Sequence, residues 1–332
     1  MEFNPFLPEV KENPYPYYRY LRDHAPVHQV KDLGYWVLTR YDDVLYALKN
    51  PHLFSSSTSM AALLGELNPF YAEAPVIIGS DPPLHSRLRK LVNRAFTPRR
   101  IASLEAHMHE MVHSLLDRAA AEGEFDLTRD LAIPLPVMVI AELLGIPPER
   151  YREFRRWADA VIQGSNGGTA MSPEMRAEIR QNIGELRAYF EEAIADYRRL
   201  PSDNLISDLV RAEEEDQVLT GTEVLNMAII VMLGGSETTT NLLGNAMLAL
   251  LNNLEQLALV RANPAFVPSL VEEALRYDAP VQGLFRQVTQ DVELSGTTLP
   301  AGVVVQLMFG SANRDERKFA DPDRFDVTRN SD

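Results

Sequence analysis

Residues 227–251 read MAIIVMLGGSETTTNLLGNAMLALL, and Glu237 is the only ionisable side chain in this stretch. The preceding Thr220-x-x-Glu223 is typical of a capping box, which starts a helix. A helix over 222–253 would span about 48 Å, the width of a whole domain, so we expect it to run through the core. The pattern predicts a mostly α protein built around one long central helix.

Two adjacent glycines, Gly234 and Gly235, interrupt the apolar part of this helix. Each costs roughly 1 kcal/mol relative to alanine, so something should need the backbone to be close or locally open there, such as a flat ligand lying against the helix. Glu237 and Thr238 are typical of a proton relay, because a buried carboxylate and a neighbouring hydroxyl can pass a hydrogen bond along the helix. The alternative is two helices broken at Gly-Gly, with Ser236 capping the second.

Helical spacing of apolar residues recurs along much of the chain, and short segments alternate as strands do. Two helical stripes lie between Leu84 and Leu115, and further helices are expected at about 136–144, 148–163, 173–199, 204–214 and 266–277. Small sheets are expected from strands at 27–31, 35–39, 285–289, 292–294 and 303–308, and a long loop at 55–83. Because no repeat or linker divides the chain, we expect a single domain over 1–332.

The composition limits the function. Lys and Arg total 32 against 47 Asp and Glu, a formal charge of −15, which argues against binding to nucleic acid. The absence of cysteine removes disulfides and thiolate metal ligands from these residues and is compatible with a reducing cytoplasm. The amino terminus does not resemble an export signal, and the apolar run 227–235 is far shorter than the roughly 20 residues that cross a bilayer. We expect a soluble, cytoplasmic protein with no membrane anchor.

A second group of candidate residues is basic. His85 and Arg89 are one helical turn apart, so their donors could hold one carboxylate group together. From 82 to 104 there is no acidic residue, although the segment contains Arg87, Arg89, Lys90, Arg94, Arg99 and Arg100. In so acidic a chain, this positive surface is suited to an anionic ligand and to an acidic protein partner. The alternative for the His85 and Arg89 pair is a solvated helix face.

Taken in order, these features resemble the cytochrome P450 family over essentially the whole chain. His85-x-x-x-Arg89 is similar to the family's propionate-binding helix, and Gly234–Thr239 is similar to its oxygen-activating helix. Glu273-x-x-Arg276, by itself an ordinary ion pair, is similar to the family's Glu-x-x-Arg helix. The resemblance implies that Arg286 binds a haem propionate. It also implies that Arg324, in Asp321-Pro322-Asp323-Arg324-Phe325, completes a buried network with Glu273 and Arg276.

The resemblance implies a P450 fold and a haem-dependent monooxygenase that inserts one atom of dioxygen into a hydrophobic small molecule, by hydroxylation or epoxidation. Glu237 and Thr238 would route protons as catalytic residues. The implied haem-binding residues are His85, Arg89, Gly234, Gly235, Thr238 and Arg286. The implied substrate pocket includes Met232, Val281, Leu284 and Phe285. Because no nucleotide-binding motif is present, electrons would come from a ferredoxin-type protein and its reductase, docking near the Arg87–Arg100 surface.

One feature departs from the family pattern, since the residues present include no axial cysteine for the iron. The resemblance implies that the cysteine loop and the final helices would follow Asp332. We therefore expect a form of the domain that is incomplete at its carboxyl terminus and inactive alone, because thiolate ligation favours O–O cleavage. One alternative is a catalytically silent relative that stabilises another enzyme. Another is an unrelated acidic helical scaffold protein.

Overall fold

The computed structural model describes residues 3–5, 7–57, 76–96, 98–166, 171–216 and 219–329. The chain forms two compact units. We call Met1–Met60 with Asn241–Asp332 the sheet unit, and Ala61–Thr240 the helical unit. Most of the loop expected at 55–83 lies outside the described residues, and the single-domain organisation stays a prediction.

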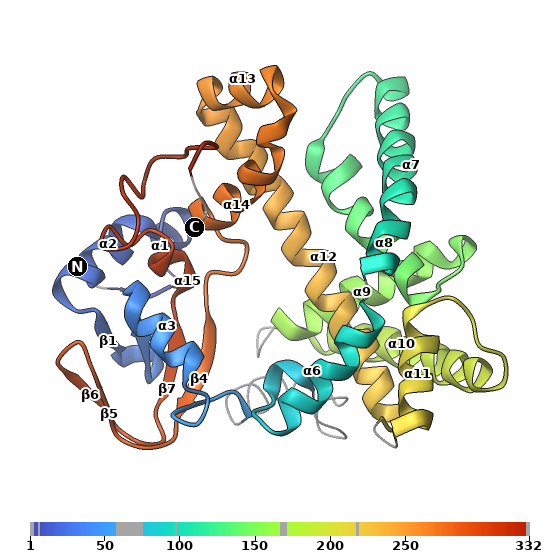
Figure 1. The fold of residues 1–332 in the computed structure, drawn as a ribbon, viewed down its shortest axis with the longest axis horizontal. Helices are drawn as coiled ribbons and strands as arrows, with labels where there is room; N and C mark the ends of the chain where they lie inside the picture. Colours follow the sequence, from blue (N-terminus) through green and yellow to red (C-terminus); the bar gives the residue numbers. More distant parts are fainter. Residues whose placement is uncertain are drawn as a thin grey trace. The chain divides into compact units, whose positions relative to one another are not determined.

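The sheet unit is built on a five-stranded sheet with the strand order β1-β2-β7-β4-β3 (Figure 1). β2 and β7 are parallel, and the other neighbouring pairs are antiparallel. The five strands are β1 Val27–Val30, β2 Tyr35–Leu38, β3 Phe54–Ser55, β4 Leu284–Val288 and β7 Val304–Leu307. A separate hairpin pairs β5 Val292–Leu294 with β6 Thr297–Leu299. The helices of this unit are α1 Pro8–Glu12, α2 Tyr15–His24, η1 Lys31–Leu33, α3 Tyr41–Lys49, α13 Leu254–Ala262, η6 Pro264–Phe266, α14 Val267–Tyr277 and α15 Phe309–Ala312.

The strands expected at 27–31 and 35–39 are confirmed, and they form an antiparallel hairpin. β1 and β2 are joined by η1 and by Gly34, whose φ of 71° is a left-handed conformation that glycine adopts without a Cβ clash. Leu38 and Leu307 are completely buried in the core of this sheet. The register of β4 against β7 places Leu284, the first residue of β4, opposite Leu307.

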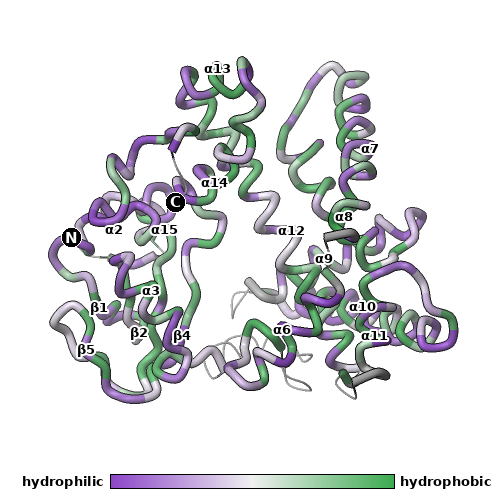
Figure 2. The backbone as a smooth tube through the Cα atoms, in the orientation of Figure 1, coloured by the Kyte–Doolittle hydropathy of each residue, from purple (hydrophilic) through white to green (hydrophobic). Residues whose placement is uncertain are grey.

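The helical unit is an assembly of amphipathic helices. In Figure 2, hydrophilic and hydrophobic positions alternate along α7, as expected of a helix with one buried face. The core of the helical unit includes Phe154, Trp157, Leu186 and Phe190, each 2% exposed or less. The helices are η2 Ile77–Gly79, α6 Leu84–Ala95, α7 Pro98–Glu122, the π-helical turn η3 Thr128–Ala132, α8 Pro134–Leu144, η4 Pro148–Arg150, α9 Tyr151–Asn166, α10 Pro173–Arg199 and α11 Leu205–Asp216.

The long helix expected at 222–253 is confirmed as α12, Gly221–Asn252, a single helix of 32 residues. The capping box is also present, because the Thr220 backbone N–H donates to Glu223 Oε2 at 2.8 Å and the Glu223 N–H donates to Thr220 Oγ1 at 3.2 Å. Since the helix continues through Gly234 and Gly235, the alternative of two helices broken at these residues is wrong.

The two glycines of α12 have different surroundings. A Cβ added at Gly235 would lie 2.4 Å from Ile140 Cδ1, so the absence of a side chain allows the close approach of α8. A Cβ added at Gly234 would meet nothing within 4 Å. Helix packing therefore explains Gly235, whereas Gly234 lies on an open side of the helix.

Replacing Gly235 with alanine should lower the free energy of unfolding by about 1–3 kcal/mol relative to Gly234→Ala, because the new methyl group collides with Ile140. The matched Gly234→Ala variant should be as stable as the wild type or up to about 1 kcal/mol more stable, through its helix propensity. Urea denaturation measures both. Ile140→Val, which removes Cδ1, should restore part of the stability of Gly235→Ala. Equal stability of the two alanine variants would show that the contact does not matter.

An ion pair between His107 on α7 and Glu142 on α8 raises the pKa of His107 above its ordinary value, mainly through the hydrogen bond from the imidazole to the carboxylate. Because the pKa of His107 is higher in the folded than in the unfolded chain, its ion pair stabilises the fold fully at pH values below the unfolded pKa of about 6.5. This stabilisation is lost as the pH rises through the folded-state pKa. His107→Gln should therefore lower Tm more at acidic pH than at pH above the folded pKa. His113→Gln, on the exposed side of the same helix, should not change this pH dependence.

Candidate functional site

The open side of α12 carries the residues that the sequence singled out for proton transfer. The Thr238 hydroxyl donates to the Gly234 carbonyl oxygen at 2.7 Å, one helical turn back. Glu237 is three residues beyond Gly234, and both are exposed. The expectation that the Glu237 carboxylate is buried was wrong, because it lies on the same open side as Gly234 and not on the side that faces the core. A flat ligand lying against Gly234 would have the Thr238 hydroxyl beside it.

Two other residues of α12 lie on the side that faces the core. Met232 is 1% exposed within the core of the helical unit, and its assignment to a substrate pocket stays a prediction. Gly235 faces Ile140, and its assignment to cofactor binding stays a prediction. Spacing alone could not separate these positions from Gly234, because an apolar helix gives no signal for which side is open.

His85 and Arg89 lie on α6, where Leu88 and Leu91 anchor the helix in the core at 1% and 4% exposure. His85 is half-buried and Arg89 is exposed. Within the described part of the chain, neither side chain has a hydrogen bond or an ion pair, so their donors are available to an anion. Binding of a carboxylate ligand by this pair stays a prediction.

Part of the basic segment around α6 is already neutralised. Arg87 forms an ion pair with Glu223, the capping residue of α12. Arg100 pairs with Asp203 at 2.9 Å and with Asp208 at 2.6 Å. These two arginines hold α6 and α7 to neighbouring elements of the helical unit, so the positive surface is smaller than the sequence indicated.

The remaining sequence-predicted binding residues belong to the sheet unit. Arg286 on β4 is half-buried, and its Nη1 donates to the Phe285 carbonyl oxygen at 2.7 Å. Phe285 packs edge-on against Tyr35, with ring centroids 5.2 Å apart. Val281 lines an apolar pocket of about 440 Å³ together with Leu48 and Phe309. Since His85 and Arg89 belong to the helical unit, their meeting with Arg286 at one haem stays a prediction.

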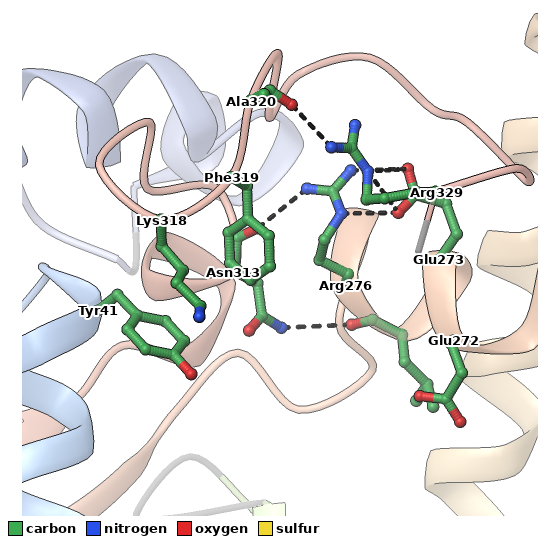
Figure 3. Close-up of a pocket in the computed structure, with 10 residues that line it drawn as sticks. Tyr41, Glu272, Glu273, Arg276, Asn313, Lys318, Phe319, Ala320 and Arg329 are labelled. Carbon is green, nitrogen blue, oxygen red and sulfur yellow. Dashed lines mark hydrogen bonds and ion pairs between the residues drawn. The ribbon is translucent and has the colours of Figure 1, made fainter. Parts of the chain in front are cut away.

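The Glu-x-x-Arg pair forms the buried network that the resemblance implied (Figure 3). Arg276 donates from Nε to Glu273 Oε2 at 2.7 Å and from Nη2 to Oε1 at 2.8 Å. The side chain of Glu273 is 2% exposed and that of Arg276 is 8% exposed. Arg276 Nη1 also donates to the carbonyl oxygens of Asn313 and Pro322, at 2.9 and 2.8 Å. The pair is therefore an anchor for the segment that follows α15.

The second arginine of this network is Arg329, not Arg324 as expected. Arg329 Nε lies 3.3 and 3.2 Å from the two Glu273 carboxylate oxygens. Arg324 contributes its carbonyl oxygen, which accepts from Arg276 and from Arg329 at 3.2 Å each. The Asp326 N–H donates to Glu273 Oε1 at 2.9 Å, so the chain passes the carboxylate before Arg329 reaches back to it. The signal in the sequence is the pair of apolar residues Phe325 and Val327, which are buried and show that this segment packs against the core.

Arg329→Met should lower the free energy of unfolding by about 2–4 kcal/mol, because it leaves the buried Glu273 carboxylate with one cationic partner. The matched variant Arg324→Met keeps the carbonyl contacts and should cost less than about 0.5 kcal/mol, as surface substitutions usually do. Chemical denaturation of the two variants measures the difference. A larger loss for Arg324→Met than for Arg329→Met would contradict the assignment.

Comparison with known proteins identifies the class of protein that this fold and these residues define. The family model described as Cytochrome P450 matches residues 170–332. The chain is 38% identical over 312 residues to cytochrome P450 107B1 of Saccharopolyspora erythraea, covering 91% of this chain and 75% of that protein. The structure of CYP109Q5 from Chondromyces apiculatus matches with a TM-score of 0.89 and 40% identity, over 98% of this chain and 80% of that one. CYP109E1 from Bacillus megaterium in complex with testosterone matches with a TM-score of 0.85 and 34% identity, over 96% and 82%.

The chain therefore belongs to the cytochrome P450 family, whose members bind haem and act as monooxygenases. The expected P450 fold, mostly helical with small sheets, is confirmed, and the alternative of an unrelated scaffold protein is wrong. Among the residues that the structure describes, no helix combines the length and the apolar character that crossing a membrane requires.

Proposed function

We propose that this protein is a haem-dependent monooxygenase that hydroxylates or epoxidises a hydrophobic small molecule. The observation that carries the proposal is the open side of α12, where Gly234 leaves room for a flat ring and Thr238 is hydrogen-bonded to the Gly234 carbonyl oxygen at 2.7 Å. None of the 332 residues is a cysteine, so a thiolate ligand for the iron cannot come from them. We therefore expect no monooxygenase activity from these residues alone.

The basic residues described above would hold the haem. His85 and Arg89, which have no partner within the described residues, would bind one propionate through charge-assisted hydrogen bonds. Arg286 would bind a propionate from the sheet unit. When bound, haem supplies the iron that activates dioxygen, while the protein supplies binding, orientation and protons.

Proton delivery would begin at Glu237 and involve Thr238. Glu237 is exposed, so its carboxylate can exchange protons with water. The Thr238 hydroxyl donates its hydrogen to Gly234 O. The lone pairs of its oxygen can still accept a hydrogen bond from a proton donor. Glu237 would act as the general acid that supplies protons, and the Thr238 oxygen, whose own hydrogen stays on Gly234 O, would accept a hydrogen bond from the group that carries each proton onward.

The substrate would be hydrophobic. Val281, Leu284 and Phe285 are half-buried apolar residues that present surface to a ligand. Pockets for small molecules are lined mainly by such side chains. The similar CYP109E1 was solved in complex with testosterone, an apolar molecule, which supports this substrate class.

A titration with hemin, followed by the change in its absorption, tests the proposal. We expect one hemin per chain, and affinity reduced by about tenfold or more in His85→Leu/Arg89→Leu, because each charge-assisted hydrogen bond contributes about 1.5–3 kcal/mol. Lys90→Leu, on the same helix, is the matched control and should change little. Absence of hemin uptake by the wild type would contradict the proposal and favour the catalytically silent partner protein.

Electrons would come from an acidic ferredoxin-type protein and its reductase, docking on the basic segment at α6. Arg94 is exposed in the last turn of α6, so it is the residue to test. Arg94→Glu should slow ferredoxin-dependent reduction of bound haem, and salt should slow the wild-type reaction, since exposed charges are screened beyond about 10 Å at 0.1 M. Arg180→Glu on α10 is the control. Rates insensitive to both salt and Arg94→Glu would exclude this docking surface.

A further inference from the structure

The segment from Tyr277 to Gln282 connects α14 with β4 inside the sheet unit. After Tyr277 it forms neither helix nor strand, so its backbone lacks the regular hydrogen bonds of secondary structure. Side chains from remote parts of the sequence bind it instead. We call Tyr15, Tyr18, Asn245 and Arg314, together with Asp278, the Asp278 cluster.

Tyr15 contributes the shortest contact of the cluster. Its hydroxyl donates to Asp278 Oδ1 at 2.5 Å, across 263 residues of sequence. Burial raises the pKa of Tyr15 well above its ordinary value, and the nearby Asp278 charge adds to this effect. The hydroxyl is therefore protonated at any physiological pH and acts as a permanent donor to Asp278.

Arg314 fixes the start of the segment. Its guanidinium carbon lies 3.5 Å from the ring centroid of Tyr15 and 3.9 Å from that of Tyr277. Its Nε donates to the Tyr277 carbonyl oxygen at 2.7 Å, and the residue is 6% exposed. A planar guanidinium held between two rings has little freedom, so it keeps Tyr15 and Tyr277 at a fixed separation.

The rest of the segment is held in the same way. Asn245 on α12 donates from Nδ2 to the Asp278 carbonyl oxygen at 3.0 Å. Tyr18 donates to Gln282 Oε1 at 3.2 Å, and the Gly310 N–H donates to the Gln282 carbonyl oxygen at 3.1 Å. A Cβ at Gly310 would lie 2.1 Å from Gln282 Oε1, so the Gln282 side chain packs directly against this glycine. Both ends of the segment are therefore fixed before β4 begins at Leu284.

We propose that Tyr15 and Asn245 are positioning residues for the wall formed by Val281, Leu284, Phe285 and Arg286. This inference rests on the proposed function, which assigns these four residues to the substrate and to a haem propionate. Two donors, one from α2 and one from α12, meet at Asp278 and set where β4 starts. Because a displacement of about 1 Å at a site costs binding and rate, loss of either donor weakens the site without touching it.

The experiment compares amide hydrogen exchange and hemin affinity in the same variants. Tyr15→Phe keeps the ring against Arg314 but removes the donor, and Asn245→Ala removes the second donor independently. Losing one hydrogen bond should speed exchange in 279–286 by about three- to tenfold and weaken hemin binding by a similar factor. Asp278→Asn keeps an acceptor for Tyr15 and should behave like the wild type. Tyr20→Phe, on the same helix and 37% exposed, is the control.

The remaining outcomes overturn the proposal in distinguishable ways. Unchanged exchange in 279–286 would show that the cluster does not hold the segment. Exchange that rises equally in β1 and β2 would show a general loss of stability. Faster local exchange with wild-type hemin affinity would show a role in stability and none in positioning. If the wild type itself takes up no hemin, the proposed function fails, and the positioning role fails with it even where local exchange is faster.

Discussion

The apolar first half of the helix α12 has to be buried, because Glu237 is the only ionisable side chain between Met227 and Leu251. In the helical unit its residues Ala228, Ile229 and Met232 are at most 1% exposed. Burying a large apolar side chain contributes about 1.5–3 kcal/mol, so the packing around α12 dominates the energetics of this region. Gly234 and Glu237 are exposed on the same helix, and the candidate chemistry is found there.

Buried polar groups define the geometry of the sheet unit. Glu273 accepts from Arg276 and Arg329, and these guanidinium groups also bind the carbonyl oxygens of a segment that has no regular structure of its own. Such networks add little net stability compared with apolar residues, but removing one partner is costly. Their value here is positional, because one carboxylate and two arginines determine the course of the chain after α15. Asp278 does the same for the chain before β4.

Local patterns predicted much of the fold, and long-range contacts could not be predicted. The capping box at Thr220, the hairpin turn at Gly34 and the pair Glu273 and Arg276 depend on residues a few positions apart, so the sequence displays them directly. The contact between Tyr15 and Asp278 spans 263 residues and leaves no local signal. Gly235 was assigned to the ligand because a glycine that makes room for Ile140 looks the same in sequence as one that makes room for a cofactor. Arg329 was missed because the resemblance pointed to the nearer arginine.

The Asp278 cluster has a consequence for recombining relatives of this protein. Tyr15, Asn245, Asp278 and Arg314 all belong to Met1–Met60 and Asn241–Asp332, although they are distant in sequence. A chimera that exchanges Ala61–Thr240 as one block inherits the whole cluster from a single parent. A crossover placed between Tyr15 and Thr39 instead combines a donor from one parent with an acceptor from the other. Crossover points that fall between members of the cluster, in Met1–Met60 or in Asn241–Asp332, therefore place the two partners of a contact in different parents.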